Sequence, residues 1–209
     1  MTATEKRPLN EVYPIAEQVK ASLTPYCRRI EIAGSIRRHR PMVGDIEIVA
    51  IPKTYIWRNL LNEVVKVDNY LWNFLDEQAD KGNILRGCWG DIYRSFEFYT
   101  RQGHKYKVDV FTTAEDAWGS KFTIRTGSQE FSKWLVTNRN YGGALPNHLY
   151  HDENRLKNRR TGQVHLLFEE RDFFEMCEIP YIMPELRDDE AWIAFVEDFG
   201  KKARSTSMS

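Results

Sequence analysis

The sequence has little cysteine, no long apolar run and no excess of either charge. Its three cysteines stand far apart among 209 residues, with no Cys-x-x-Cys pair, so neither a disulfide framework nor a structural zinc site is indicated. No apolar run approaches the roughly 18 residues of a membrane-spanning helix. The polar start at residues 1–10 lacks the apolar stretch of a signal peptide. We therefore expect a cytoplasmic protein that makes no membrane contact.

The charge balance names no partner, because 30 Lys and Arg residues offset 30 Asp and Glu residues. With 42% hydrophobic residues the chain is not of the disordered class, and its length suits one domain or two small ones. The charge is separated locally, however. Residues 28–40 hold five arginines and one glutamate, and residues 169–190 hold nine acids and two arginines. Neutrality therefore hides distinct basic and acidic segments.

Apolar patterns predict the first secondary-structure elements. Residues 12–23 repeat with the 3.6 period of a helix, which Pro25 ends. Residues 45–51 are rich in β-branched side chains and stop at Pro52, so they predict a strand. Residues 57–79 carry leucines and valines at helical spacing and predict a second helix.

The rest of the chain alternates short strands and helices. Segments 96–99 and 106–111 are β-rich and joined by a glycine turn, so they predict a hairpin. Further along, the sequence predicts a helix after Gly127-Ser128, a short strand at 164–168 and an acidic helix at 169–178. A shift in composition near residues 113–120 divides an N-terminal α/β unit from a C-terminal α+β unit.

Three carboxylates are the strongest candidates for chemistry. Because side chains alternate along a strand, Asp45 and Glu47 project from the same face. Two neighbouring acids repel each other, and a divalent metal ion is the usual remedy at a catalytic centre. Asp109 stands between two valines, where an acid is costly unless it is matched. A solvated strand face would produce the same alternation, so the pattern alone leaves both interpretations open.

A possible phosphate loop precedes the first two acids. Gly34 and Ser35 offer backbone N–H groups and a hydroxyl, and Arg38 offers a charged donor. An ordinary solvated basic loop would have the same residue pattern. A metal site and an anion site on one strand-loop-strand unit would, however, suit chemistry on phosphates.

Together these segments resemble the DNA polymerase X family, the polymerase β-like nucleotidyltransferases. The family pattern is Gly-Ser, a hydrophobe, Arg-Arg, then Gly-Asp-x-Asp, and later a strand with Arg-x-Asp. It is matched here by residues 34–38, 44–47 and 107–109. Further matches follow in family order over roughly residues 11–192: Thr126-Gly127-Ser128, Asn147, and Ile179-Pro180-Tyr181-Ile182-Met183-Pro184-Glu185-Leu186-Arg187.

The resemblance implies an α+β (mixed α/β) fold of two domains. Residues 1–113 would form a nucleotidyltransferase palm with a small mixed or antiparallel sheet and helices. Residues 114–209 would form a small α+β thumb. No room remains for the family's lyase domain or its helix-hairpin-helix region, so the layout is similar to the smallest viral members.

The resemblance also implies roles for individual residues. Asp45 and Glu47 would hold two Mg²⁺ ions, and Asp109 would bind the catalytic ion beside the primer 3′-hydroxyl. The nucleotide would contact the following residues, the first four at its phosphates and the rest near its sugar and base: Gly34, Ser35, Arg38, Gly44, Thr126, Gly127, Ser128 and Gln129. Two cations about 3.5–4 Å apart suit such a phosphoryl transfer, which needs mostly positioning and charge from the protein.

Several residues depart from the family pattern. Glu47 replaces an aspartate, and Lys107 replaces an arginine, losing its bidentate fork. We therefore expect an active but metal-tolerant centre with a preference for Mn²⁺. Ile124-Arg125 replaces an aromatic pair, which puts sugar discrimination in doubt. Gln129 and Ser132 would face the nascent base pair, but both read equally well as ordinary exposed helix residues.

Contacts to nucleic acid are less specific. The run of residues 155–160 holds four positive charges and no acid. Most such runs are merely solvated, although this one would suit backbone contact in a protein without the usual DNA-gripping domain. The candidate residues for nucleic-acid binding are Lys107, Ser132, Asn147, Arg155, Lys157, Arg159 and Arg160.

These observations favour one function and leave two others open. We expect a monomeric, magnesium-dependent DNA polymerase that adds dNTPs to a DNA 3′ end during gap-filling repair. Template-independent nucleotidyl transfer is an alternative within the same fold. A non-catalytic nucleic-acid-binding module on a polymerase X scaffold is the alternative from another class.

Overall fold

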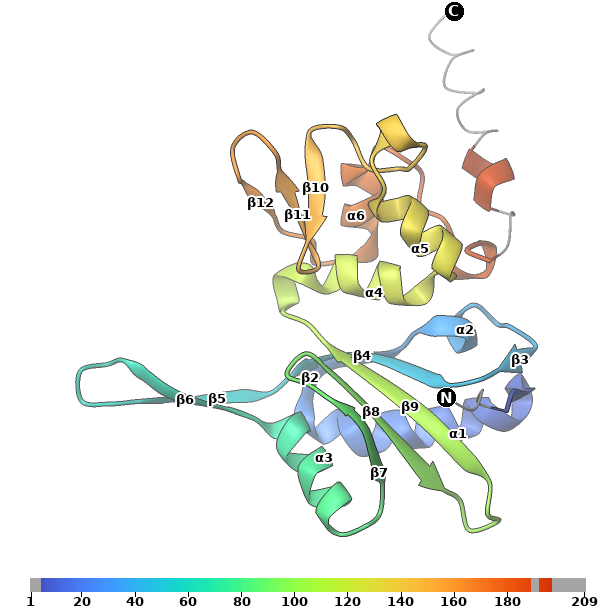
Figure 1. Ribbon diagram of the computed structural model, residues 1–209, viewed down its shortest axis with the longest axis vertical. Helices are drawn as coiled ribbons and strands as arrows, with labels where there is room; N and C mark the ends of the chain where they lie inside the picture. The colour runs from blue at the N-terminus through green and yellow to red at the C-terminus, as the bar shows by residue number, and fades with distance from the viewer. Residues whose placement is uncertain (1–4, 189–191, 197–209) are drawn as a thin grey trace, which may run out of the picture. The chain divides into compact units, whose positions relative to one another are not determined.

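The computed structural model describes residues 5–188 and 192–196, which form two compact units (Figure 1). Unit 1 takes in the chain up to Ile36 together with Pro41–Thr113. Unit 2 begins at Ala114 and also contains residues Arg37–Arg40. Both units mix helices and strands, so the expected α+β fold class is confirmed. Among the described residues, no helix combines the length and apolar character that crossing a membrane requires.

Unit 1 is built on a five-stranded sheet in the order β2-β4-β9-β8-β7. Strands β4 and β9 run parallel, and the other neighbours are antiparallel. The strand bounds are Cys27–Ile32 for β2, Ile46–Pro52 for β4, Leu85–Trp89 for β7, Tyr93–Tyr99 for β8 and Lys105–Thr112 for β9. The predicted strand at 45–51 and the predicted hairpin of 96–99 with 106–111 are therefore confirmed.

Two helices pack against this sheet in the core of unit 1 (Figure 1). Helix α1 (Leu9–Leu23) confirms the helix predicted at residues 12–23, and it buries Val12, Ala16 and Leu23. Helix α3 (Tyr70–Asp80) buries Leu71, Trp72 and Leu75. The short elements are β1 (Arg7–Pro8), β3 (Met42–Val43), α2 (Gly34–Arg37) and η1 (Thr24–Tyr26).

The prediction of a helix over residues 57–79 is wrong in its first half. Strands β5 (Thr54–Arg58) and β6 (Val64–Asn69) form a separate antiparallel hairpin, and the helix begins only at Tyr70. At the tip, the Asn59 side chain accepts hydrogen bonds from the backbone N–H groups of Leu61 and Glu63. Asparagine favours such turns over helix. The hairpin's apolar residues are exposed, so their spacing reflects no buried helix face.

In the part of unit 2 that the structure describes, helices α4 (Trp118–Thr126), α5 (Gln129–Val136) and α6 (Glu170–Met176) pack with a three-stranded antiparallel sheet. The short turns are η2 (Glu115–Ala117), η3 (Arg139–Tyr141) and η4 (Pro184–Leu186). The predicted helices after Ser128 and at 169–178 are confirmed in α5 and α6. Phe131, Phe173 and Phe174 are fully buried in the core of this unit.

The sequence predicts only one of the three strands in the sheet of unit 2. Its strands are β10 (Leu149–Asp152), β11 (Arg155–Asn158) and β12 (Val164–His165), so only the start of the predicted strand at 164–168 forms. Strands β10 and β11 are joined at Glu153 and Asn154, which both have positive φ angles, as tight hairpin turns require. Each of β10 and β11 buries a single leucine, Leu149 and Leu156, and this apolar pattern is too short to predict a strand.

Candidate functional site

The parallel pair β4 and β9 brings acids onto one face of the unit 1 sheet. Glu47 lies opposite Asp109 in the strand register, and Asp45 directly precedes β4. The intervening residues Ile46 and Ile48 are fully buried on the other side. The predicted alternation of residues 45–48 is therefore confirmed, and it places charge on one face and core on the other.

Asp109 is the most buried of these acids, with 5% of its surface exposed. One carboxylate oxygen accepts a hydrogen bond from Tyr93 Oη at 2.9 Å, and the other accepts one from Lys107 Nζ at 2.7 Å. The same ammonium group lies 3.8 Å from Asp45 Oδ2. Lys107 therefore joins the two aspartates. Asp109, an acid on a core strand, is stabilised by its hydrogen bonds from Lys107 and Tyr93.

The ammonium group of Lys107 is held in its charged form. Burial favours the neutral amine, but the hydrogen bond and charge attraction of Asp109 and the charge of Asp45 outweigh burial and raise the pKa. The pKa of Tyr93 is also raised, first because the phenol is partly buried and further because it donates to Asp109. Both groups therefore keep the protons with which they contact Asp109 at neutral pH.

Tyr93 is a site residue that the sequence reasoning missed. Its ring stacks on Phe111 with centroids 4.7 Å apart, and it opens strand β8 three residues before the predicted start of that strand. Tyr93, Ser95 and Glu97 alternate along β8 on the face of Asp109. This polar alternation is the sequence pattern from which the earlier start of the strand could be predicted.

The side chain of Glu47 is directed to a different neighbour. Gly34 has a φ angle of +61°, and a side chain on it would collide with the Glu47 carboxylate. Glycine is required at this position both for the backbone angle and for the close approach. The neighbouring candidates Ser35 and Gly44 are half-buried, Ser35 on α2 and Gly44 directly before Asp45. The glycine of the Gly-Ser pair therefore lies against a carboxylate.

The three acids are of the residue type that binds a divalent cation, but their side chains do not all point to one place. Carboxylate oxygens are the donors that Mg²⁺ and Mn²⁺ prefer. Asp45 and Asp109 converge on the Lys107 ammonium, whereas Glu47 is turned toward Gly34. Across residues 5–188 and 192–196, no group of three or more His, Cys, Asp or Glu side chains is placed to hold a metal ion. The structure thus brings together a pair of the three expected ligands.

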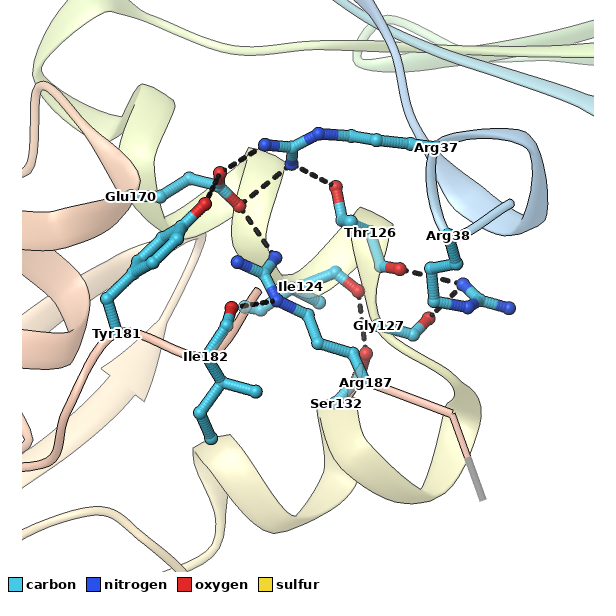
Figure 2. Close-up of polar contacts among 10 residues, drawn as sticks. All are labelled: Arg37, Arg38, Ile124, Thr126, Gly127, Ser132, Glu170, Tyr181, Ile182 and Arg187. Atoms are coloured by element: carbon cyan, nitrogen blue, oxygen red, sulfur yellow. Dashed lines mark hydrogen bonds and ion pairs between the residues drawn. The ribbon is translucent and has the colours of Figure 1, made fainter. Parts of the chain in front are cut away.

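A second charged cluster lies within unit 2 (Figure 2). The guanidinium of Arg37 binds both carboxylate oxygens of Glu170, at 2.9 and 2.5 Å, and donates to the Thr126 hydroxyl at 2.7 Å. Arg187 donates to the same carboxylate at 2.7 Å, and Tyr181 donates to it at 3.2 Å. Glu170 and Arg187 are buried, so this cluster is part of the core of unit 2.

The charge of Glu170 is maintained by its arginine partners. Burial alone would raise the pKa of this carboxyl, but the hydrogen bond from Arg37 and the charge of Arg187 and Arg37 lower it on balance. Glu170 therefore remains ionised at neutral pH. The sequence indicates this position only as part of an acidic helix, and one of the paired arginines, Arg37, lies 133 positions away.

Arg38 contacts two of the predicted nucleotide residues of unit 2, Thr126 and Gly127. Its Nη1 atom donates to the carbonyl oxygens of Thr126 and Gly127 at 2.7 and 2.9 Å (Figure 2), and its Nε atom donates to Asp188 at 2.7 Å. Ser128 caps helix α5 by accepting from the backbone N–H of Phe131. Thr126 is fully buried, with its hydroxyl bonded to Arg37 and its carbonyl to Arg38.

Gln129 and Ser132, the two helix residues expected near a base pair, differ in exposure. Gln129 is exposed at the start of α5. Ser132, in contrast, is half-buried, and its hydroxyl donates to the Ile124 carbonyl at 2.6 Å (Figure 2). Ser132 therefore ties α5 to α4 rather than presenting a free polar group.

The basic run of residues 155–160 is largely engaged within unit 2. Arg155 pairs with Asp116 at 2.6 Å, and Lys157 pairs with Asp152 at 2.7 Å. Arg159 donates through Nε to the Leu149 carbonyl, whereas the exposed Arg160 side chain makes no hydrogen bond with the described residues. The exposed Asn147 donates to Asn140. Of the four basic residues in this run, only Arg159 and Arg160 are exposed.

Comparison of the chain with protein-family models and with curated proteins returned no match.

Proposed function

We propose that this chain is a metal-dependent nucleotidyltransferase that adds nucleotides from dNTPs to a DNA 3′-hydroxyl. Unit 1 would act as the palm and unit 2 as the thumb of a minimal polymerase X-like enzyme that fills gaps during DNA repair. The observation that carries the proposal is the convergence of Asp45 and buried Asp109 on one cation, in a chain whose motifs follow the polymerase X order.

The chain's own residues supply positioning and charge for this chemistry. Asp45 and Asp109 would hold a divalent cation, with Glu47 as the further ligand that the family pattern implies. A bound divalent cation lowers the pKa of a hydroxyl nucleophile and neutralises charge on a pyrophosphate leaving group. Tyr93 fixes the orientation of Asp109 through its hydrogen bond. Arg38 would donate to phosphate oxygens, because a guanidinium is a strong charge-assisted donor.

The test is extension of a labelled primer on gapped DNA, with Mg²⁺ or Mn²⁺. We expect the wild type to extend the primer and Asp109→Asn to lose at least about 10³-fold in rate, since charge stabilisation dominates such reactions. Asp80→Asn is the matched control, because Asp80 is an exposed acid of unit 1 that pairs with Arg86. Absence of extension by the wild type with either metal ion would refute the proposal and leave a non-catalytic binding module.

One contact favours template-independent transfer as the second candidate. The Ser132 hydroxyl is already bonded to the Ile124 carbonyl, and Val136 follows one turn later on α5. Fewer polar groups on this helix would contact a template base pair. Equal rates on single-stranded and gapped primers would support template independence, and a rate that requires the template would exclude it.

A further inference from the structure

The carboxylate of Asp188 forms an ion pair with Arg38, the arginine that the proposed function assigns to phosphate binding. Asp188 follows η4 and accepts a hydrogen bond from Arg38 Nε at 2.7 Å. Only 10% of the Arg38 side chain and 11% of the Asp188 side chain are exposed. Charges that are removed from water in this way interact more strongly than exposed pairs do. The pair therefore neutralises much of the attraction that Arg38 offers to another anion.

Arg38 has donors left for a second partner. A guanidinium carries five N–H groups. Asp188 takes the one on Nε, and the carbonyls of Thr126 and Gly127 take those on Nη1 (Figure 2). The Nη2 atom makes no hydrogen bond with the described part of the chain. The two carbonyls therefore fix the guanidinium, while Nη2 and the Asp188-bound Nε are the edges that a phosphate would use.

Asp188 also has a second cation within reach. Its Oδ2 atom is buried without a hydrogen bond and lies 3.6 Å from Arg40 Nε. A carboxylate oxygen buried in this state gains by moving toward a donor. Asp188 can thus pass from Arg38 to Arg40 without losing a charged partner, and such a shift would expose Arg38 Nε.

We propose that Asp188 competes with the nucleotide's phosphates for Arg38 and so weakens polyphosphate binding to unit 2. Carboxylate and phosphate oxygens use the same guanidinium donors, so both cannot hold Nε at once. Phosphate binding then requires the carboxylate to move to Arg40. The inference rests on the proposed role of Arg38, and it adds a control on that site.

The test is the binding of inorganic tripolyphosphate to the full chain without divalent metal, measured by calorimetry. Asp188→Asn removes the charge and keeps the size, so we expect roughly three- to tenfold tighter binding. Glu185→Gln is the matched control. It removes an equal charge three residues before Asp188, where Glu185 lies in η4, faces His39 at 3.5 Å and makes no hydrogen bond with Arg38. We expect it to change the affinity less than about twofold.

Two further variants make the result decisive. Arg38→Gln added to Asp188→Asn should remove the gain. Asp188→Ser serves if Asp188→Asn unfolds, as judged by circular dichroism. Unchanged or weaker tripolyphosphate binding by the folded variants would overturn the inference, as would absence of binding in all of them. Tripolyphosphate needs no turnover, so tighter binding by Asp188→Asn in a chain that extends no primer would support the inference while the proposed enzyme activity failed.

Discussion

In unit 1 one ammonium group lies between two carboxylates, whereas in unit 2 one carboxylate lies between two guanidinium groups. Lys107 joins Asp45 to Asp109, and Glu170 joins Arg37 to Arg187. The two clusters therefore have opposite charge surpluses among the groups that form them. The first arrangement can accept more positive charge, and the second already satisfies a buried acid with basic groups.

The clusters also differ in what they contribute to the protein. Glu170 and Arg187 are buried and bonded on several sides, so they hold helix α6 and the segment after Tyr181 together. Lys107 and Asp45 are about one-third exposed, with 30% and 38% of their side chains accessible. A cluster that retains contact with water can exchange partners, and the buried one serves as a scaffold. Unit 1 is accordingly the candidate for chemistry.

Glu170→Gln should have the largest effect, on the stability of unit 2. The substitution leaves two guanidinium groups without their shared charge, and breaking such a buried pair costs about 3–5 kcal/mol. We expect the free energy of unfolding of unit 2, measured in urea at pH 7, to fall by about this amount. Glu175→Gln, an exposed acid on the same helix, should change it by less than about 0.5 kcal/mol.

The pH dependence of the same variant gives the sign of the effect. The folded-state pKa of Glu170 lies below its value in the unfolded chain, so the carboxylate stabilises the fold above the unfolded value of about 4.3. This stabilisation is lost as the pH falls through the folded-state pKa. The difference between wild type and Glu170→Gln should therefore shrink in acid. A difference that stays constant to low pH would show that the charge of Glu170 contributes nothing.

A smaller effect distinguishes paired from exposed basic residues in unit 2. Binding of single-stranded DNA, followed by fluorescence anisotropy over a salt series, should depend on Arg159 and Arg160 more than on Arg155 and Lys157. Replacing the first two with Gln should reduce the salt slope by about 1 to 2. The same change at Arg155 and Lys157 should have less effect, because acids already neutralise them. Equal slopes for both double variants would contradict this assignment.

Local pattern predicted the acidic face of β4 but not the direction of every side chain on it. The alternation over residues 45–48 was enough to separate charged Glu47 from buried Ile46 and Ile48. The contact of Glu47 with Gly34 depends on how α2 packs against β4, which no spacing reports. The convergence of Asp45 on Lys107 likewise depends on the parallel pairing of β4 with β9.

The remaining misses have two physical causes. The β5–β6 hairpin carries exposed leucines and valines, so apolar spacing there indicated a helix face that does not exist. The contacts of Arg38 and Arg37 join residues 150 and 133 positions apart in sequence, and charge pairing over such separations is set by the packing of unit 2. A single sequence contains the partners but not their pairing.

Whether the unit 1 cluster receives a cation can be measured by titrating the full chain with Mn²⁺ and following the free ion by electron paramagnetic resonance. We expect saturable binding by the wild type and its loss in Asp109→Asn. We also expect roughly three- to tenfold tighter binding in Lys107→Gln, which removes the competing ammonium, but not in Lys105→Gln, whose partner is Glu97. Equal Mn²⁺ binding by wild type and Asp109→Asn would contradict the claim that the unit 1 cluster receives a cation.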